Sequence, residues 1–301
     1  MSAHGTIRRY TLIIEKLISH QNPSFQILKE YLHDHGFEIS PRTLQRDIEQ
    51  IRNEFAVEIK YNRSKNGYYI DKDDSINFDA FLRFLEIVGT ANLISESLKD
   101  GKGTLNYISF ESQGSLKGIE NLKSLLFAIK NHRKITFIHE NFETGKTRKY
   151  SVKPYLLKEY QNRWYVIGLL PGLNEFRTFA IDRIEKVEVL SETFEPNNKI
   201  NPAKLFENTI GLVYSYNKLE EVILSFTPLQ AKYVKSLPLH KSQEIIKETN
   251  KEVIVKLKVI PNYELMQKIL MIGYQVKVLE PEWFKEDIMK SLKENLKNYE
   301  R

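Results

Sequence analysis

The stretch NRWYVIGLLPGLNEFRTFAIDRI, residues 162–184, decides the fold of the middle of the chain. Two runs rich in aromatic and β-branched residues flank a Pro-Gly pair, which is the pattern of two strands joined by a turn. Arginines and aromatic side chains are distributed along both runs. The segment therefore predicts a hairpin, which is either ordinary core or one wall of a pocket that binds a flat anion.

Side chains alternate between the two faces of a strand, so parity divides this hairpin into faces. Arg163 and Tyr165 share a face of the first strand. Arg177, Phe179 and Arg183 share a face of the second if no bulge intervenes. In a simple register Arg163 lies opposite Arg183, and like charges directly opposed destabilise a sheet. An anion between them would remove that repulsion, which predicts a ligand site.

The same register places Trp164 opposite Asp182. For these two residues we favour a structural interpretation, in which Trp164 fills the core and Asp182 pairs with an arginine. For Arg177 and Arg183 we favour ligand contact. All of these pairings depend on the register, because a shift by one residue moves every side chain of a strand to the other face.

Further short strands surround the hairpin. The segments KITFIHEN (134–141) and RKYSVKPYLLKEYQN (148–162) precede it, and a helix is expected over 119–129. Four or five strands within about 60 residues, with one preceding helix, are typical of a small barrel. Residues 118–200 are therefore predicted to form an SH3-like (Sm-like) β-barrel.

The first 72 residues predict a DNA-binding domain. In the third of three expected helices, ISPRTLQRDIEQIRNEF, Ser40 is a favourable N-cap and Pro41 a favourable first residue. At about 100° per residue, one side of this helix is apolar and the opposite side carries Arg42 and Arg46, with Gln45 at the flank. Arginine and glutamine near the start of an exposed helix suit the reading of base edges in the major groove.

The segment VEIKYNRSKNGYYI (57–70) predicts a hairpin with Arg63 and Lys65 at its tip. Three helices followed by such a hairpin form the winged helix-turn-helix layout, in which the tip contacts phosphate. The alternative is a helical bundle with a solvated face. The first 70 residues hold ten Lys and Arg against eight Asp and Glu, so binding would depend on a few cations. The candidate DNA contacts are Ser40, Arg42, Thr43, Gln45, Arg46, Arg63 and Lys65.

The last hundred residues have a different pattern of predicted secondary structure. Strand and helix patterns alternate as β-α-β-β-α-β and end in a helix, which predicts a ferredoxin-like sandwich over 201–301. Residues 73–117 are expected to be a helical linker. His240 is interpreted as a surface or packing residue.

Several motifs resemble those of WYL-domain transcriptional regulators. The triplet at 164–166, Trp-Tyr-Val, resembles the Trp-Tyr-Leu that names the domain. The Arg-x-Phe-x-x-Asp-Arg-Ile segment of the family is matched by Arg177, Phe179, Asp182, Arg183 and Ile184. RTLQRDIEQIR (42–52) resembles the helix-turn-helix that precedes WYL domains. HKSQ (240–243) and YQVKVLEP (274–281) resemble the C-terminal extension that commonly follows them. His139 stands where the family commonly has a tyrosine.

The resemblance implies an α+β multidomain regulator that binds double-stranded DNA and forms a homodimer through its C-terminal extension. It also implies that the WYL domain binds a nucleotide or a single-stranded nucleic acid effector. Cationic and aromatic side chains on one surface suit such a ligand, because bases stack on rings and arginine forks bind phosphate. The candidate effector contacts are His139, Arg148, Lys153, Arg163, Tyr165, Arg177, Phe179 and Arg183.

Composition and motifs argue against other classes. The chain has 301 residues and no cysteine, which excludes disulfides and thiol catalysis. It has no His-Glu-x-x-His and no Gly-x-Ser-x-Gly, so we expect no enzymatic activity, cofactor or metal. Neither a signal peptide nor an apolar run of about 18 residues occurs, and a cytoplasmic protein is expected.

Two alternatives stay open at this stage. One is a constitutive dimeric repressor whose barrel is purely structural. Its sign would be that Arg163 and Arg177 are bound by the protein's own carboxylates, such as Asp182 or Glu175. The other is an enzyme that processes nucleic acid, which the motifs do not favour.

Overall fold

The computed structural model describes residues 3–75, 78–99, 117–142, 144–172, 175–197, 204–213 and 218–300, with no side-chain description at 3–4 and 92–99. It divides into two compact units, Met1–Glu111 and Ser112–Arg301. The described residues form helices and three antiparallel sheets, so the mixed α/β class expected from the sequence is confirmed.

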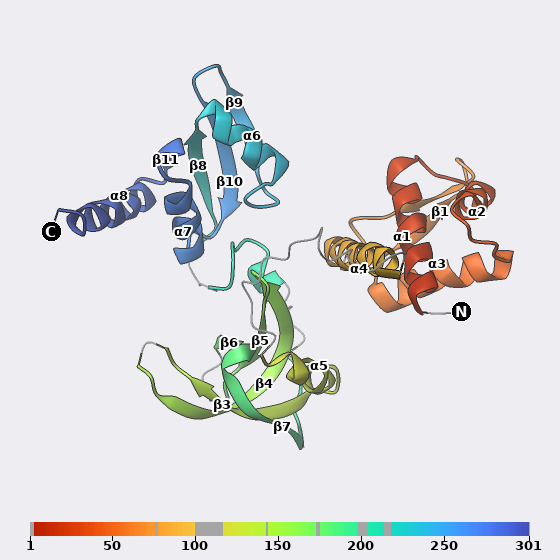
Figure 1. Cartoon of the computed structure of the whole chain (residues 1–301), viewed down its shortest axis with the longest axis horizontal. Coiled ribbons are helices and arrows are strands. Elements are labelled where there is room, and N and C mark those ends of the chain that lie inside the picture. Colours follow the sequence, from red (N-terminus) through yellow and green to blue (C-terminus); the bar gives the residue numbers. More distant parts are fainter. Residues whose placement is uncertain are drawn as a thin grey trace. The chain divides into compact units, whose positions relative to one another are not determined.

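The first unit contains three helices, a hairpin and a long fourth helix (Figure 1). These elements are α1 (Ala3–Ser19), α2 (Phe25–Asp34), α3 (Pro41–Phe55), β1 (Ile59–Asn62), β2 (Gly67–Ile70) and α4 (Phe78–Lys99). Helix α3 begins at Pro41 as predicted. One core joins them, built from residues that include Ile13, Ile14, Leu28, Leu32, Leu44, Ile48, Ile51, Val57 and Ile59.

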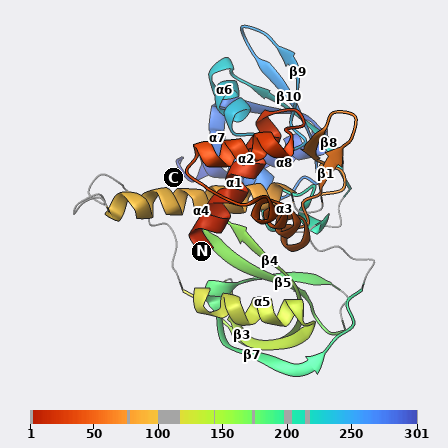
Figure 2. The ribbon, with the colours of Figure 1, turned by 90° about the vertical axis from the view of Figure 1, so that its right-hand side faces the viewer.

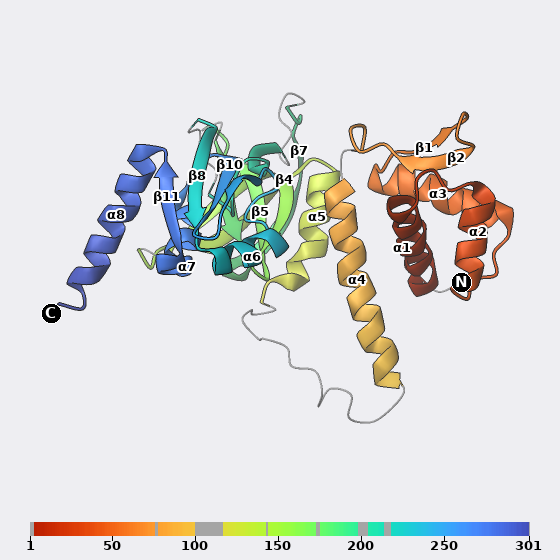
Figure 3. The same cartoon turned by 90° about the horizontal axis from the view of Figure 1, so that it is seen from above.

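Helix α4 starts inside this core and then extends past the other helices of its unit (Figure 3). Phe78, Phe81 and Leu85 are buried with the residues of α1 and α3. The ring of Phe55 lies 4.4 Å from that of Phe81 and 5.7 Å from that of Phe84. The first turns of α4 are therefore anchored to the end of α3 by aromatic packing.

The hairpin β1–β2 is fastened to the turn between α1 and α2. The backbone N–H of Tyr68 donates to the carbonyl oxygen of Pro23 at 2.9 Å. Gly67 packs so closely that a Cβ atom there would lie 1.9 Å from the carbonyl oxygen of Asn22. A glycine is required at this position because the two backbones touch.

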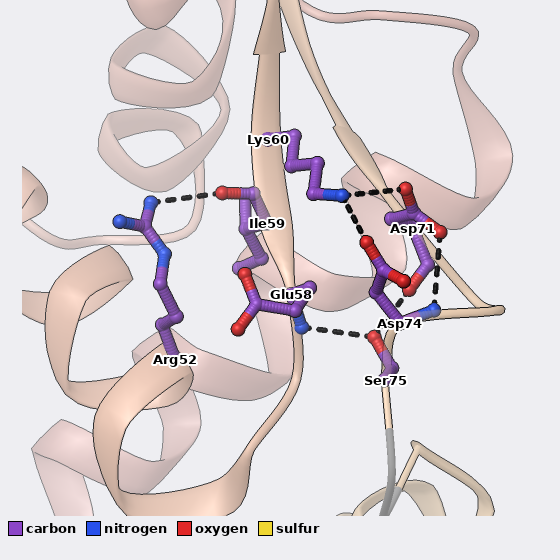
Figure 4. Close-up of polar contacts among 7 residues, drawn as sticks. All are labelled: Arg52, Glu58, Ile59, Lys60, Asp71, Asp74 and Ser75. Carbon is purple, nitrogen blue, oxygen red and sulfur yellow. Dashed lines mark hydrogen bonds and ion pairs between the residues drawn. The ribbon is translucent and has the colours of Figure 1, made fainter.

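Polar contacts hold the base of the hairpin on its other side (Figure 4). Arg52 of α3 donates to the carbonyl oxygen of Ile59 at 2.8 Å. The ammonium of Lys60 pairs with Asp71 at 2.9 Å and also with Asp74. These contacts, with the bond to Asp74 first, raise the pKa of Lys60 above its usual value. The same lysine lowers the pKa of Asp71.

The second unit begins with a short helix against a five-stranded sheet (Figure 2). Helix α5 (Leu122–Lys130) follows the 3-10 turn η2 (Ile119–Asn121). The strands are β3 (Arg133–Glu140), β4 (Thr147–Tyr160), β5 (Arg163–Leu169), β6 (Phe176–Ala180) and β7 (Ile184–Thr193). Their order is β6-β5-β4-β3-β7. The core beneath α5 includes Leu125, Ala128, Ile135, Phe137, Val152, Val166 and Phe179.

The expected register of the β5–β6 hairpin is wrong by one residue. Tyr165 pairs with Ala180, and Gly168 pairs with Arg177. Strand β6 ends at Ala180, and η3 (Ile181–Arg183) turns the chain before β7 begins. Arg163 therefore does not lie opposite Arg183, because the continuous second strand on which that pairing depended is interrupted by η3.

The C-terminal part of the second unit has the expected order of elements (Figure 1). They are β8 (Glu220–Phe226), α6 (Pro228–Ser236), β9 (Glu244–Glu248), β10 (Val253–Val259), α7 (Tyr263–Ile272), β11 (Val276–Glu280) and α8 (Glu282–Lys297). The sheet order is β11-β8-β10-β9, and every pair is antiparallel. His240 contacts the Ser242 hydroxyl at 2.7 Å and the Glu207 carbonyl at 2.8 Å, which agrees with a packing role.

Candidate functional site

The exposed start of α3 gathers most of the predicted DNA contacts. Ser40 caps the helix, and its hydroxyl accepts a hydrogen bond from the Thr43 N–H at 3.2 Å. Capping leaves the following turn regular, so side chains one turn apart lie side by side. One open hollow is lined by Ser40, Arg42, Thr43, Gln45, Arg46 and Glu49.

The two arginines of this hollow are available to a ligand. Arg42 and Arg46 are exposed, and neither has a carboxylate within ion-pair distance in the described part of the chain. Gln45 lies 3.4 Å from Glu49, a long and weak hydrogen bond. The hollow thus presents two unpaired guanidinium groups beside an amide, which are the groups that read guanine and adenine edges.

An ion pair inside the core orients α3 under this surface. Arg9 of α1 donates from Nε to Asp47 Oδ2 at 2.6 Å and from Nη2 to Oδ1 at 3.0 Å. Next to it, the Tyr10 hydroxyl donates to Gln50 at 2.7 Å. Sequence reasoning missed this pair, although Asp47 stands between core positions and a buried carboxylate requires a partner.

The hairpin tip exposes Arg63 and Lys65, as the sequence predicts. Neither residue lines the hollow on α3. A second hollow lies at the hairpin and the start of α2, and its lining residues were not predicted as contacts. They are Ser24, Phe25, Gln26, Tyr61, Asn66 and Tyr68. The signal for this surface was Tyr61, an aromatic residue that lies on the same face of β1 as the buried Ile59 and is half exposed.

In the second unit, an aromatic cluster spans the inner face of strands β3, β4 and β6. Phe179 lies 5.0 Å from Tyr150, 5.0 Å from Phe137 and 5.3 Å from His139, measured between ring centroids. Because His139 pairs with Arg148 across β3 and β4, that arginine is at the edge of the same cluster. Its guanidinium lies 5.5 Å from the centroid of the Tyr150 ring.

Arg183 joins this cluster from η3, and no carboxylate of the described residues forms an ion pair with it. Its guanidinium carbon lies 4.6 Å from the centroid of Phe142, and its buried Nε has no hydrogen-bond partner among the described residues. The buried Nε2 of His139 is also unpaired. Burial first, and then the charge of Arg183, lower the pKa of His139. The cluster therefore favours an anion over a further cation.

Four of the eight predicted effector residues converge here: His139, Arg148, Phe179 and Arg183. We name this group, with Tyr150 and Phe142, the cation–aromatic cluster. Its members come from the ends of β3 and β4, from β6 and from η3. The effector role of these residues remains a prediction, and their proximity supports it.

Arg163 and Tyr165 are placed differently. Arg163 forms an ion pair with Asp182, whose second carboxylate oxygen is buried and unpaired. Trp164 packs against the core on the other face of β5. The structural interpretation of Trp164 and Asp182 is thereby confirmed. Tyr165 is partly buried, and its pKa is raised mainly by burial.

Arg177 and Lys153 lie toward the opposite end of β5. Arg177 pairs with Gly168, and Lys153 pairs with Leu169. The five steps from Arg163 to Gly168 span about 17 Å at roughly 3.3 Å per residue. Arg177 Nη2 is 4.0 Å from the Glu175 carboxylate, and both side chains are about half exposed, so this contact holds the arginine weakly.

Other kinds of site receive no support from the described residues. They contain no group of three or more His, Asp or Glu side chains that could hold a metal ion. Among the helices that could be searched in the described ranges, none is both long and apolar enough to cross a membrane.

The comparisons with known proteins find two domains in the chain. Residues 120–189 match the WYL domain, and residues 218–296 match the WCX domain. No curated protein matches the sequence. The chain thus carries a WYL domain followed by a WCX domain.

Two solved structures are similar to the chain at low identity. Proteasome accessory factor B/C (PafBC) of Arthrobacter aurescens shares 16% identity at a TM-score of 0.31, over 97% of this chain and 46% of that one. A CRISPR Cas-related protein shares 13% identity at a TM-score of 0.42, over 99% of this chain and 86% of that one. The chain therefore spans less than half the length of the PafBC chain.

Proposed function

We propose that the protein is a DNA-binding transcriptional regulator whose WYL domain binds a nucleotide or a single-stranded nucleic acid. The observation that carries the proposal is that the chain has two separate surfaces suited to nucleic acid, one on each unit. Among the described residues, the arginines at the start of α3 have no ion-pair partner, and neither has Arg183 in the cation–aromatic cluster of the WYL domain.

In this proposal the domains keep the boundaries expected from the sequence. Residues 1–72 are a winged helix-turn-helix, 73–117 a helical linker, 118–200 an SH3-like barrel, and 201–301 a ferredoxin-like domain that forms a homodimer. The boundaries near 117 and 200 fall at or within stretches outside the described residues.

Helix α3 is the proposed reading element. Its first two turns carry Arg42, Gln45 and Arg46 toward solvent, and such side chains make bidentate hydrogen bonds to base edges in the major groove. Arg63 and Lys65 at the hairpin tip are proposed to contact phosphate, which positions the domain without reading sequence.

The DNA-binding half is tested by selecting duplexes from a random library with the wild-type protein. Arg46→Ala is expected to weaken binding to the selected duplex by about 1–3 kcal/mol and to relax the base preference at one position of the site. Arg46→Lys keeps the charge but loses the fork, so it should lose specificity while keeping nonspecific affinity. Selection of no sequence by the wild type would refute specific DNA binding.

The effector is proposed to act on the geometry of a dimer. A symmetric dimer reads two half-sites about 34 Å apart, so a small change in the separation of its reading helices changes operator affinity. Effector and operator then influence each other's binding reciprocally. Operator affinity measured with and without a short oligonucleotide tests this. Equal affinities would refute regulation of DNA binding by the effector.

One observation favours a second function, that of a constitutive repressor. Arg163 is neutralised by Asp182, and Arg177 lies close to Glu175. Arg183 and Arg148 distinguish the two functions because neither has an ion-pair partner in the described residues. Titration of wild type and Arg183→Ala with short oligonucleotides decides between them. Loss of affinity in the variant supports the sensor, whereas no binding by either protein supports the repressor.

A further inference from the structure

Phe142 and Arg183 are arranged so that each leaves one surface free. The guanidinium carbon of Arg183 lies over the Phe142 ring, 4.6 Å from the ring centroid. A planar guanidinium donates hydrogen bonds from its edge, in the plane of the group. Stacking on its face therefore does not compete with an anion at its edge.

The other side of the ring is open. Phe142 is 64% exposed, so one side of its ring is accessible to a ligand. The turn that carries it is closed by two backbone hydrogen bonds, from Asn141 N–H to the Lys146 carbonyl at 3.0 Å and from Gly145 N–H to the Asn141 carbonyl at 2.8 Å. The ring is thus exposed next to a residue, Asn141, that two backbone hydrogen bonds hold.

The guanidinium of Arg183 lies near this ring without an ion-pair partner in the part of the chain that the structure describes. Asp182, the nearest acidic residue in sequence, is engaged by Arg163. Arg183 has no carboxylate within ion-pair distance in the described ranges, and its Nε is unpaired. Arg148, on the strand that follows the same turn, is exposed and also unpaired there. Two cations and one open ring therefore lie around a single turn.

We propose that Phe142 is a base-stacking platform of the effector site. A phosphate binds at the edge of Arg183, and the neighbouring base stacks on the outer face of the Phe142 ring. The ring also holds the guanidinium in place before the ligand arrives, which reduces the entropy lost on binding. This inference rests on the proposed effector function and adds the residue that distinguishes a nucleotide from a bare phosphate chain.

Two ligands with the same number of phosphates test the platform: a thymidine tetranucleotide and its abasic counterpart. Stacking of one base on an aromatic ring corresponds to about 5- to 150-fold in affinity. Wild type is expected to prefer the base-containing ligand by a factor in this range. Phe142→Ala should bind both ligands with the affinity that wild type has for the abasic one. Phe142→Leu should also lose the preference, because leucine retains apolar bulk but has no ring on which a base can stack.

Phe142→Trp should restore or increase the preference, and Tyr274→Ala is the matched control. Tyr274 is 94% exposed in the C-terminal part of the chain, and its removal should leave both affinities unchanged. The variants are exposed substitutions, so an unchanged unfolding temperature checks that they fold.

The outcomes separate this inference from the function on which it rests. If wild type binds both ligands and Phe142→Ala keeps the wild-type ratio, the platform is refuted while an anion sensor stands. The same holds if Phe142→Ala tightens both ligands, because the ring would then mask Arg183. If wild type binds neither ligand, the effector function fails and the platform fails with it.

Discussion

Arg9 of α1 and Asp47 of α3 form a bidentate ion pair that is almost completely removed from solvent, with 2% and 0% exposure. Such a pair adds little net stability, because desolvation of two charges offsets their attraction. It does restrict how the two helices fit together, since a rotation of α3 would leave two buried charges unpaired. The pair therefore fixes which face of α3 is presented to solvent.

Removal of one partner should be costly. Asp47→Ala leaves the guanidinium of Arg9 buried without its carboxylate, and we expect a loss of about 3–5 kcal/mol in the free energy of unfolding. Chemical denaturation of wild type and variant measures it. Arg9→Met combined with Asp47→Leu should be close to neutral, because the pair is then replaced by apolar side chains of similar size. A double variant as unstable as Asp47→Ala would contradict this account.

Loss of a cation at the hairpin tip should weaken binding to all duplexes alike. Lys65 is exposed there and is proposed to contact phosphate rather than bases. In Lys65→Ala, the slope of log K against log salt is expected to fall in magnitude by about 0.9. Fluorescence anisotropy over a series of salt concentrations measures the slope. Arg83→Ala on α4 is the control, and a loss confined to one selected sequence would argue against a phosphate contact.

Two glycines of the first unit should respond in opposite directions to alanine. In Gly67→Ala the new Cβ would lie 1.9 Å from the Asn22 carbonyl oxygen, so the hairpin must move off the α1–α2 turn. We expect a loss of at least about 2 kcal/mol in unfolding free energy. Gly89, within α4, has nothing within 4 Å of a new Cβ. Gly89→Ala should stabilise by about 0.5–1 kcal/mol, because alanine favours helix. Thermal unfolding of the two variants provides the comparison, and equal shifts would contradict it.

The cation–aromatic cluster should make stability depend on pH. Burial and Arg183 lower the pKa of His139 below its usual 6.5, against the opposing charges of Glu140 and Asp182. The unfolded chain then binds the proton more tightly, so this contribution is present above about pH 6.5 and is lost as pH falls through the folded pKa. The slope from one group is at most about 1.4 kcal/mol per pH unit.

His139→Phe isolates this contribution, because the ring packing is kept and the titration removed. The unfolding free energy of wild type minus that of the variant should decrease between pH 7.5 and pH 5, because only the wild type loses the contribution of His139. Arg148, across the strand pair, and His240, whose pKa burial also lowers, are present in both proteins, and their effects cancel to first order. A difference independent of pH would show that His139 does not titrate in this range.

Local signals predicted the elements well. The Ser-Pro start of α3 and the alternation in β8 and β10 specify their elements without distant contacts, and their bounds follow the sequence closely. The β5–β6 register was different, because the connecting loop sets it and shifts every pair by one residue. Beyond the last pair, η3, which packs at Ile181, ends the second strand. No periodicity in the sequence marks such a turn inside an apolar run.

The candidate sites show the same difference between what local sequence signals predict and what depends on distant contacts. The predicted contacts on the first two turns of α3 do line one hollow, since helical spacing alone brings them together, and their role in DNA binding stays a prediction. The effector set was split, because its members come from strands whose neighbours are fixed by the order of the sheet. Phe142 was not predicted at all. An exposed aromatic residue in a turn has no periodic pattern, and its contact with Arg183 crosses about forty residues of chain.

Lys60 ties the hairpin to the segment that precedes α4. Asp71 and Asp74 hold β1 from the segment just before α4, Ser75 accepts the Glu58 N–H at 2.8 Å, and Phe81 anchors α4 in the same core. The base of the hairpin and the first turns of α4 are therefore fastened to one and the same core.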